Sequence, residues 1–190
     1  MKPTFFDFAP FDFLDLNDPW AIDGSHVDYL FANCAELPIG AKIVEIGSHR
    51  GVSTSAFIAA INHRPDLTLH CIDPVITDDL RRVVSKCDHP DNVILHEAQS
   101  TQHWEPGADL LFIDGCHEWP ALYEVARALA EKCPLIIMHD THSLKQHPDC
   151  YGAFLGWQIL QSARDYDCIC DNQDRDSQAT WRGMGIAKRI

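Results

Sequence analysis

The sequence predicts an α/β fold: a doubly wound, mostly parallel sheet of seven strands with helices on both faces. Short β-branched runs alternate along the chain with segments in which apolar residues recur every three or four positions. The run Leu110–Ile113 is apolar throughout, as expected of a parallel strand that is covered on both faces. The length of 190 residues supplies one hydrophobic core and is short for two, so residues 1–190 are expected to form a single domain.

Seven segments are predicted to be strands and five to be helices, in an alternating order that implies right-handed crossovers. The strands are Lys42–Ile46, Thr68–Ile72, Asn92–His96, Asp109–Ile113, Leu135–His139, Tyr166–Cys170 and Arg182–Lys188. The helices are Ser25–Glu36, Thr54–Asn62, Thr77–Lys86, Pro120–Lys132 and Tyr151–Arg164. Residues 1–40 comprise an aromatic arm and then the first of these helices, of which Ser25 is the predicted N-cap.

The chain is acidic, with 15 Lys and Arg against 28 Asp and Glu and a formal net charge of −13. Because nucleic acids and anionic membranes are polyanions, we expect neither as the main partner and favour a small-molecule substrate. No apolar stretch reaches the roughly 20 residues that a membrane span needs. The eight cysteines are scattered without a Cys-x-x-Cys pair, which favours free thiols in a reducing compartment and therefore a cytoplasmic location.

A glycine-containing turn follows the first predicted strand. Gly47 and Gly51 stand in the spacing Gly-x-x-x-Gly, which allows a tight turn and a close approach of a ligand to the backbone. The third glycine of a dinucleotide fingerprint and the Gly-Lys-Ser/Thr of a phosphate-binding loop are both missing. The turn therefore suits a ligand without a pyrophosphate, although a plain tight turn also explains the two glycines.

Polar residues follow the second and third predicted strands. Asp73 lies roughly 20 residues beyond the glycine turn, where an acid can accept hydrogen bonds from a ribose diol. Its alternative role is to cap the next helix. Gln99 and Ser100 follow the third strand, where they can meet the edge of an adenine or cap a helix.

Two aspartates end the fourth and fifth predicted strands, which we expect to be neighbours. Asp114 is followed by His117, and Asp140 stands between His139 and His142. Two carboxylates placed close together repel each other unless a proton or a cation lies between them. The group therefore suits Mg²⁺ or Mn²⁺, although each aspartate alone can also be a helix cap.

Four motifs occur in a fixed order: Val44–Thr54, the turn at Asp73, Phe112–Glu118 and His139–Thr141. In this order they resemble the class I S-adenosylmethionine-dependent methyltransferases. The chain is most similar to the small branch that includes sugar and macrolide O-methyltransferases and cephalosporin hydroxylase-like proteins. The similarity runs from about Ile43 to His142, and the closing segment resembles the final strand of that branch. The resemblance implies a Rossmann-like core over residues 41–190 and S-adenosylmethionine as the cofactor.

The resemblance also implies a role for each residue of the glycine turn. Glu45 and Gly47 would line the methionine part of the cofactor. Ser48, Gly51 and Ser53 would support the loop around it.

Further roles fall on the ends of the other strands. Asp73 would hold the ribose hydroxyls, and Gln99 and Ser100 would lie near the adenine. Asp114 would lie where cofactor, substrate and metal meet, and His117 would lie beside the substrate.

The implied reaction is an in-line displacement, in which a substrate oxygen attacks the sulfonium methyl group. The expected catalytic residues are Asp114, His117 and His142, because either histidine can take the hydroxyl proton near neutral pH. An O-methylation of a small hydroxylated substrate follows from the similarity to O-methyltransferases.

A divalent cation is the alternative way to activate the hydroxyl, because it lowers the pKa of that group. The expected ligands are Asp114, Asp140 and His142. Metal-dependent relatives usually carry an acid or an amide where this chain has Thr141, so His142, His139 or the substrate would complete the shell.

Two rival functions stay open from the sequence. One is a noncatalytic module that binds S-adenosylmethionine, and the other is a metal-dependent hydrolase or oxygenase on the same framework. The aromatic arm is expected to pack on the core or to form a homodimer interface rather than to stack on a substrate.

Overall fold

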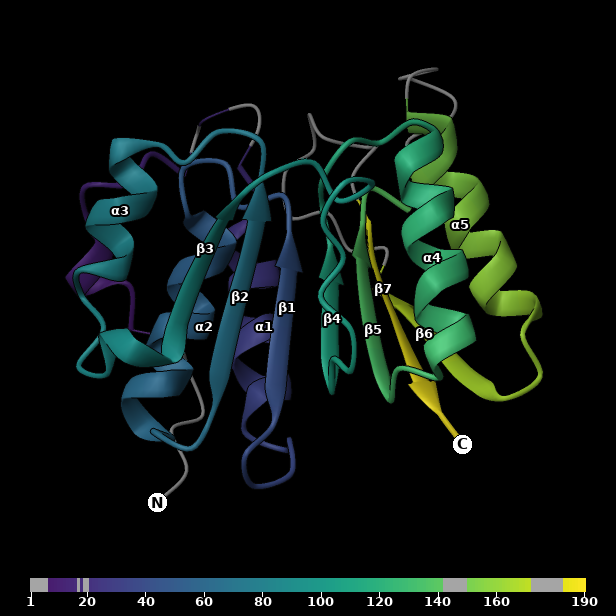
Figure 1. Ribbon diagram of the computed structural model, residues 1–190, viewed down its shortest axis with the longest axis horizontal. Coiled ribbons are helices and arrows are strands. Elements are labelled where there is room, and N and C mark those ends of the chain that lie inside the picture. The colour runs from purple at the N-terminus through teal and green to yellow at the C-terminus, as the bar shows by residue number, and fades with distance from the viewer. Residues whose placement is uncertain (1–6, 17, 19–20, 142–149, 172–182) are drawn as a thin grey trace.

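The computed structural model describes residues 7–16, 18, 21–141, 150–171 and 183–190. Its centre is one sheet of seven strands in the order β3-β2-β1-β4-β5-β7-β6, with helices on both faces (Figure 1). The strands β1 to β5 are parallel to one another, and β7 is antiparallel to both β5 and β6. This confirms the predicted doubly wound, mostly parallel sheet of seven strands.

The strand boundaries lie within two residues of those predicted, because turn residues bound short runs that are rich in apolar residues. The strands are β1 Lys42–Ile46, β2 Thr68–Asp73, β3 Val93–Glu97, β4 Leu110–Ile113, β5 Leu135–His139, β6 Tyr166–Asp171 and β7 Met184–Arg189. The polar residues that follow β1, β2, β4 and β5 therefore meet at one edge of the sheet, as parallel pairing requires.

Five α-helices and two short 3-10 helices occur in the described residues. They are α1 Gly24–Cys34, α2 Val52–His63, α3 Asp78–Val84, α4 Trp119–Glu131, α5 Tyr151–Ser162, η1 Ala9–Phe11 and η2 Pro90–Asn92. Among these helices, none is long and apolar enough to cross a membrane.

The predicted N-cap of the first helix is wrong. The helix α1 begins at Gly24, and the N-cap position is occupied by Asp23. The carbonyl oxygen of Asp23 accepts the first helical hydrogen bonds, from the amides of His26 and Val27. Ser25 therefore lies inside the first turn, where it is buried.

Two hydrophobic clusters lie on the two faces of the sheet. On one face, α1 and α2 pack on alternate strand residues such as Ile43 and Phe112. On the other face, α4 and α5 pack on the intervening residues, such as Val44 and Leu111. Every residue of β4 is buried because both faces are covered there, which explains its unbroken apolar sequence.

The connection from β3 to β4 contains no helix. Residues 98–109 are described throughout and run over the sheet as turns and irregular chain. The side chain of Lys42 holds this connection, because its Nζ donates to Oε1 of Glu105 (2.9 Å) and to the carbonyl oxygen of Pro106 (2.6 Å). Among the described residues, this segment therefore stands where a crossover helix would lie against β2 and β3.

The first turn of α5 is docked onto the segment after β4. The amides of Gly152 and Ala153 donate to the carbonyl oxygen of His117 (2.8 and 3.1 Å), which satisfies two of the free donors of the helix N-terminus. A side chain at Gly152 would overlap the carbonyl group of Glu118.

We predict that Gly152→Ala destabilises the fold by about 1–3 kcal/mol, because the added methyl group forces α5 away from Glu118. The matched control is Gly24→Ala, at the start of another helix, where a methyl group would meet no atom within 4 Å. The control is expected to change stability by no more than about 0.5 kcal/mol. Urea unfolding of the two variants checks the prediction, and equal midpoints would contradict it.

Candidate active site

A cavity of about 930 Å³ opens at the carboxyl ends of β1, β2, β4 and β5. This volume is of the size that binds a nucleoside-sized ligand together with a small substrate. The predicted site residues that line it are Gly47, Asp73, Gln99, Ser100, Asp114, His117 and Asp140. A second pocket of about 30 Å³ adjoins it, and Ser48 and Ser53 line that pocket. The structure thus brings together residues from five separate turns.

The glycine turn lies against the end of β4. Gly47 has φ of 86°, and a side chain there would overlap the backbone of Asp114. Gly51 has φ of 93° and lines neither pocket; a methyl group there would lie 2.9 Å from Cγ2 of Val83 on α3. The first glycine is therefore required where β1 and β4 meet, and the second lets α2 begin against α3.

Asp73 holds the glycine turn through hydrogen bonds to its backbone. Its Oδ2 accepts hydrogen bonds from the backbone amides of Ser48 (3.0 Å) and His49 (2.9 Å), and its Oδ1 accepts one from the amide of Val75 (2.9 Å). A carboxylate oxygen can accept two hydrogen bonds, so Oδ1 keeps capacity for a ligand in the cavity. Asp73 is thus both a structural acceptor and a residue of the cavity wall.

The structure corrects the expected place of Glu45. Its side chain is fully buried and lines neither pocket. The reason is the alternation along β1: Glu45 shares a face with Ile43 and so points toward α2, away from the cavity. There its carboxylate accepts hydrogen bonds from the hydroxyls of Ser48 (2.9 Å), Ser53 (2.5 Å) and Thr54 (2.7 Å).

Burial raises the pKa of Glu45 to about 6, and the hydrogen bonds from Ser53, Thr54 and Ser48 oppose that rise. The carboxylate also lies at the N-terminal end of α2, where the helix dipole favours a negative charge. Glu45 therefore supports the turn from the interior of the protein and does not face the cavity.

Gln99 and Ser100 line the cavity where the β3–β4 connection begins. The hydroxyl of Ser100 donates to Oε1 of Glu124, a fully buried side chain on α4. Burial raises the pKa of Glu124 to about 7. Sequence reasoning missed Glu124, although an acid among the apolar residues Ala121 and Val125 of one helix face could have indicated it.

Asp114 and Asp140 converge as predicted, and two imidazoles lie between them. Nε2 of His117 lies 3.0 Å from Oδ2 of Asp140 and 3.7 Å from Oδ1 of Asp114. Nδ1 of His139 lies 3.1 Å from Oδ1 of Asp114 and 3.3 Å from Oδ2 of Asp140. We refer to these four side chains as the acid–histidine cluster. All of them line the large cavity.

The neighbours of both imidazoles raise their pKa. Burial alone would lower the pKa of His117 and His139, but the contacts of both rings with Asp114 and Asp140, and that of His117 with Cys150, outweigh it. The result is a pKa of about 11 for His117 and about 10 for His139. With these neighbours alone, both rings carry a proton at neutral pH.

A buried histidine of α1 extends the cluster. Nδ1 of His26 and Nε2 of His139 share a hydrogen bond of 3.1 Å, and His26 is only 1% exposed. Sequence reasoning missed this contact because the two residues lie 113 positions apart. A histidine on the apolar face of the predicted helix was the only available signal.

The ligand atoms of Asp114, His117 and Asp140 lie within 4.8 Å of one another, so these three residues can hold a metal ion. Asp114 and Asp140 were predicted as ligands, and His117 was predicted as a catalytic residue. The third predicted ligand, His142, lies outside the described residues.

The sequence was compared with models of known protein families and with known proteins. The model of a family described as a methyltransferase domain matches residues 44–141, which is just over half of the chain. A comparison with curated proteins finds no match.

Solved structures share the fold at low sequence identity. The O-methyltransferase from Bacillus cereus in complex with SAH is 14% identical, with a TM-score of 0.73 over 100% of this chain and 93% of that chain. The O-methyltransferase TomG from Streptomyces achromogenes in complex with SAM is 16% identical, with a TM-score of 0.71 over 96% and 86%. The SAH-bound methyltransferase PaMTH1 from Podospora anserina is 14% identical, with a TM-score of 0.70 over 96% and 86%.

The family match spans the glycine turn, Asp73 and the acid–histidine cluster, which are the residues that the cavity brings together. The chain therefore belongs to the methyltransferase domain family.

Proposed function

We propose that this methyltransferase transfers the methyl group of S-adenosylmethionine to a hydroxyl oxygen of a small molecule, with the help of a divalent cation. One observation carries the proposal: the glycine turn with Asp73 and the acid–histidine cluster line the same cavity. The similar O-methyltransferases that hold SAM or SAH support the cofactor and the type of acceptor.

The cofactor fits the half of the cavity formed by the ends of β1, β2 and β3. Gly47 offers backbone without a side chain, and Oδ1 of Asp73 can accept a hydrogen bond from a ribose hydroxyl. Gln99 and Ser100 form the wall beyond it, where an adenine would lie. This arrangement would bring the methyl group toward Asp114, which lines the cavity next to Gly47.

A divalent cation fits the other half of the cavity. Asp114, Asp140 and His117 offer two carboxylates and an imidazole whose ligand atoms lie within 4.8 Å of one another. Oxygen-rich sites of this kind suit Mg²⁺ or Mn²⁺. Such a cation would supply a Lewis acid that lowers the pKa of a substrate hydroxyl.

In the transfer, the substrate oxygen attacks the methyl carbon in line with the carbon–sulfur bond. The electron pair of that bond stays on sulfur, which gives S-adenosylhomocysteine. The carboxylates of Asp114 and Asp140 would orient the attacking oxygen, and the hydroxyl proton, made more acidic by the cation, would leave to water in the open cavity. Without a cation, the contacts with these carboxylates raise the pKa of His117 to about 11. A bound cation would displace the proton from Nε2 and occupy that nitrogen, so His117 is a weak candidate for the general base.

We predict that Asp73→Ala lowers the affinity for S-adenosylmethionine by roughly 10- to 150-fold, because hydrogen bonds to a charged group contribute about 1.5–3 kcal/mol. Calorimetric titration with S-adenosylmethionine measures the change, and circular dichroism confirms that the variant folds. The matched control is Asp91→Ala, an exposed aspartate on η2 that does not line the cavity. Unchanged affinity in a folded Asp73→Ala protein would remove Asp73 from the cofactor site.

We further predict that Asp140→Asn lowers turnover by at least about 10- to 100-fold, as expected when a metal ligand is lost. Affinity for S-adenosylmethionine should stay close to that of the parent, because Asp140 lies on the substrate side. Formation of S-adenosylhomocysteine with a panel of small hydroxylated acceptors measures turnover. Chelation should abolish turnover, and Mg²⁺ or Mn²⁺ should restore it. Full activity after exhaustive chelation, with no metal detected by elemental analysis, would reject the cation.

A further inference from the structure

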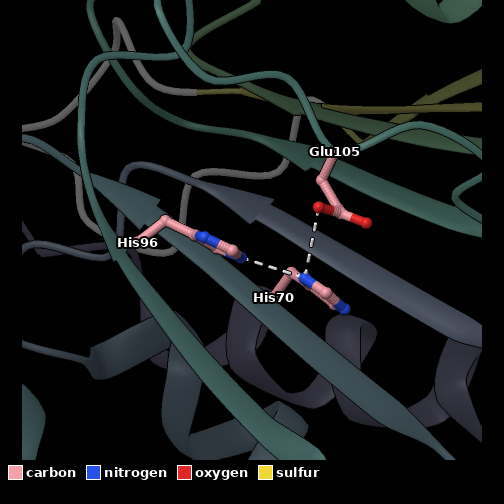
Figure 2. Close-up of side chains that lie close together, drawn as sticks. All are labelled: His70, His96 and Glu105. Atoms are coloured by element: carbon pink, nitrogen blue, oxygen red, sulfur yellow. Dashed lines mark hydrogen bonds and ion pairs between the residues drawn. The ribbon is translucent and has the colours of Figure 1, made fainter.

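A second group of histidines lies on the sheet outside the acid–histidine cluster. His96 on β3 points toward His70 on β2, and His70 lies next to Glu105 of the β3–β4 connection (Figure 2). His70 is paired in register with Val44, on the face that α4 and α5 cover farther along the sheet. Above β2 and β3 that face meets residues 98–109, which contain no helix. Polar side chains therefore occupy a place where a helix would bury apolar ones.

The nitrogen and oxygen atoms of this group are spaced like the ligand atoms around a bound metal ion. Nδ1 of His70 and Nε2 of His96 share a hydrogen bond of 3.0 Å, and Nδ1 of His70 lies 3.6 Å from Oε2 of Glu105 (Figure 2). One ligand atom from each of the three residues lies within 4.8 Å of the others. Bonds of about 2.0–2.1 Å in a tetrahedral zinc site separate neighbouring ligand atoms by roughly 3.3 Å. The two printed contacts, of 3.0 and 3.6 Å, lie on either side of that spacing.

Glu105 is held so that one oxygen faces the histidines. Its Oε1 accepts a hydrogen bond from Nζ of Lys42 (2.9 Å), and Oε2 is the oxygen nearer to His70. Lys42 also donates to the carbonyl oxygen of Pro106, which fixes the chain next to Glu105. A partner of this kind orients a ligand and balances its charge, as the second shell of a metal site does.

A third histidine lies at the same place. The ring of His103 stacks on that of His96 with a centroid distance of 4.1 Å, and its Nε2 lies 3.7 Å from Oε2 of Glu105. This Nε2 is buried and has no hydrogen-bond partner among the described residues. Burial lowers the pKa of both His70 and His96, which keeps their rings in the neutral form that binds metals.

We propose that His70, His96 and Glu105 bind a zinc ion, with His103 as the fourth ligand. Two or three imidazoles and one carboxylate form a set that suits Zn²⁺ better than Mg²⁺, which prefers oxygen. The ion would tie the β3–β4 connection to β2 and β3, in place of the packing that a crossover helix would supply. The same connection begins with Gln99, Ser100 and Thr101, which line the large cavity, so the ion would also stiffen that wall.

Zinc binding to the metal-stripped protein tests the proposal without cofactor or acceptor, so its outcome is independent of the methyl-transfer proposal. The parent protein for this test is Asp140→Asn, which weakens the acid–histidine cluster as a competing site. Zinc alone is titrated, and elemental analysis after dialysis gives the stoichiometry. The Asp140→Asn parent should hold one more zinc ion per chain than the double variant Asp140→Asn, His96→Asn. The matched control is His89→Asn, because His89 belongs to neither cluster.

Glu105→Gln is a second variant that keeps the size of the side chain and its contact with Lys42. It should weaken zinc binding by roughly 10- to 100-fold, and His96→Asn by at least as much. Cobalt titration gives an independent reading, because a tetrahedral Co²⁺ site with imidazole ligands absorbs visible light. Added zinc should raise the melting temperature of the parent and the His89→Asn control more than that of either variant. Equal zinc stoichiometry and affinity in the parent and both variants would overturn the proposal.

Discussion

The buried carboxylate of Glu45 is the interaction on which the cavity depends. A charged group with no exposed surface is costly to bury unless several donors surround it, and here three hydroxyls do so. Ser48 makes the critical link, because its hydroxyl donates to Glu45 while its amide donates to Asp73. Two acids from adjacent strands thus hold one turn from two sides. The turn keeps its shape before any ligand enters, so a ligand need not supply the energy to order it.

The glycine turn, held in this way, also positions the acid–histidine cluster. Gly47 packs directly on the backbone of Asp114. The end of β1 therefore fixes the position from which the carboxylate of Asp114 enters the cavity. On the far side, the first turn of α5 holds the carbonyl oxygen of His117 through two amides. His117 therefore approaches Asp140 from a segment anchored at both ends. Side chains held by rigid elements in this way keep a reactive geometry better than side chains on free loops.

Patterns along the chain predicted most of the fold but only part of the site. Strand positions follow from local β-branched runs, and the convergence of Asp114 and Asp140 follows from the pairing of β4 with β5. Alternation along the strand predicts that the side chain of Glu45 points to the same face as Ile43. The family resemblance instead implied that Glu45 lines the cofactor site. The contacts of His26 and Glu124 depend on how α1 and α4 pack against the rest of the fold. The local sequence of each helix does not predict this packing. Ser25 failed as a cap because Asp23, two residues earlier, occupies the N-cap position.

The two histidine groups show how charge balance separates sites built from the same residue types. In the acid–histidine cluster, two carboxylates face two imidazoles, and the pKa of both rings rises. In the group of His70, His96 and Glu105, a single carboxylate is shared with Lys42, and the pKa of both rings falls. The first group therefore offers mainly negative oxygen to a cation, and the second offers mainly neutral nitrogen. Hard ions such as Mg²⁺ suit the oxygen-rich first environment and zinc suits the nitrogen-rich second, so the two proposed ions differ in the site that each fits better.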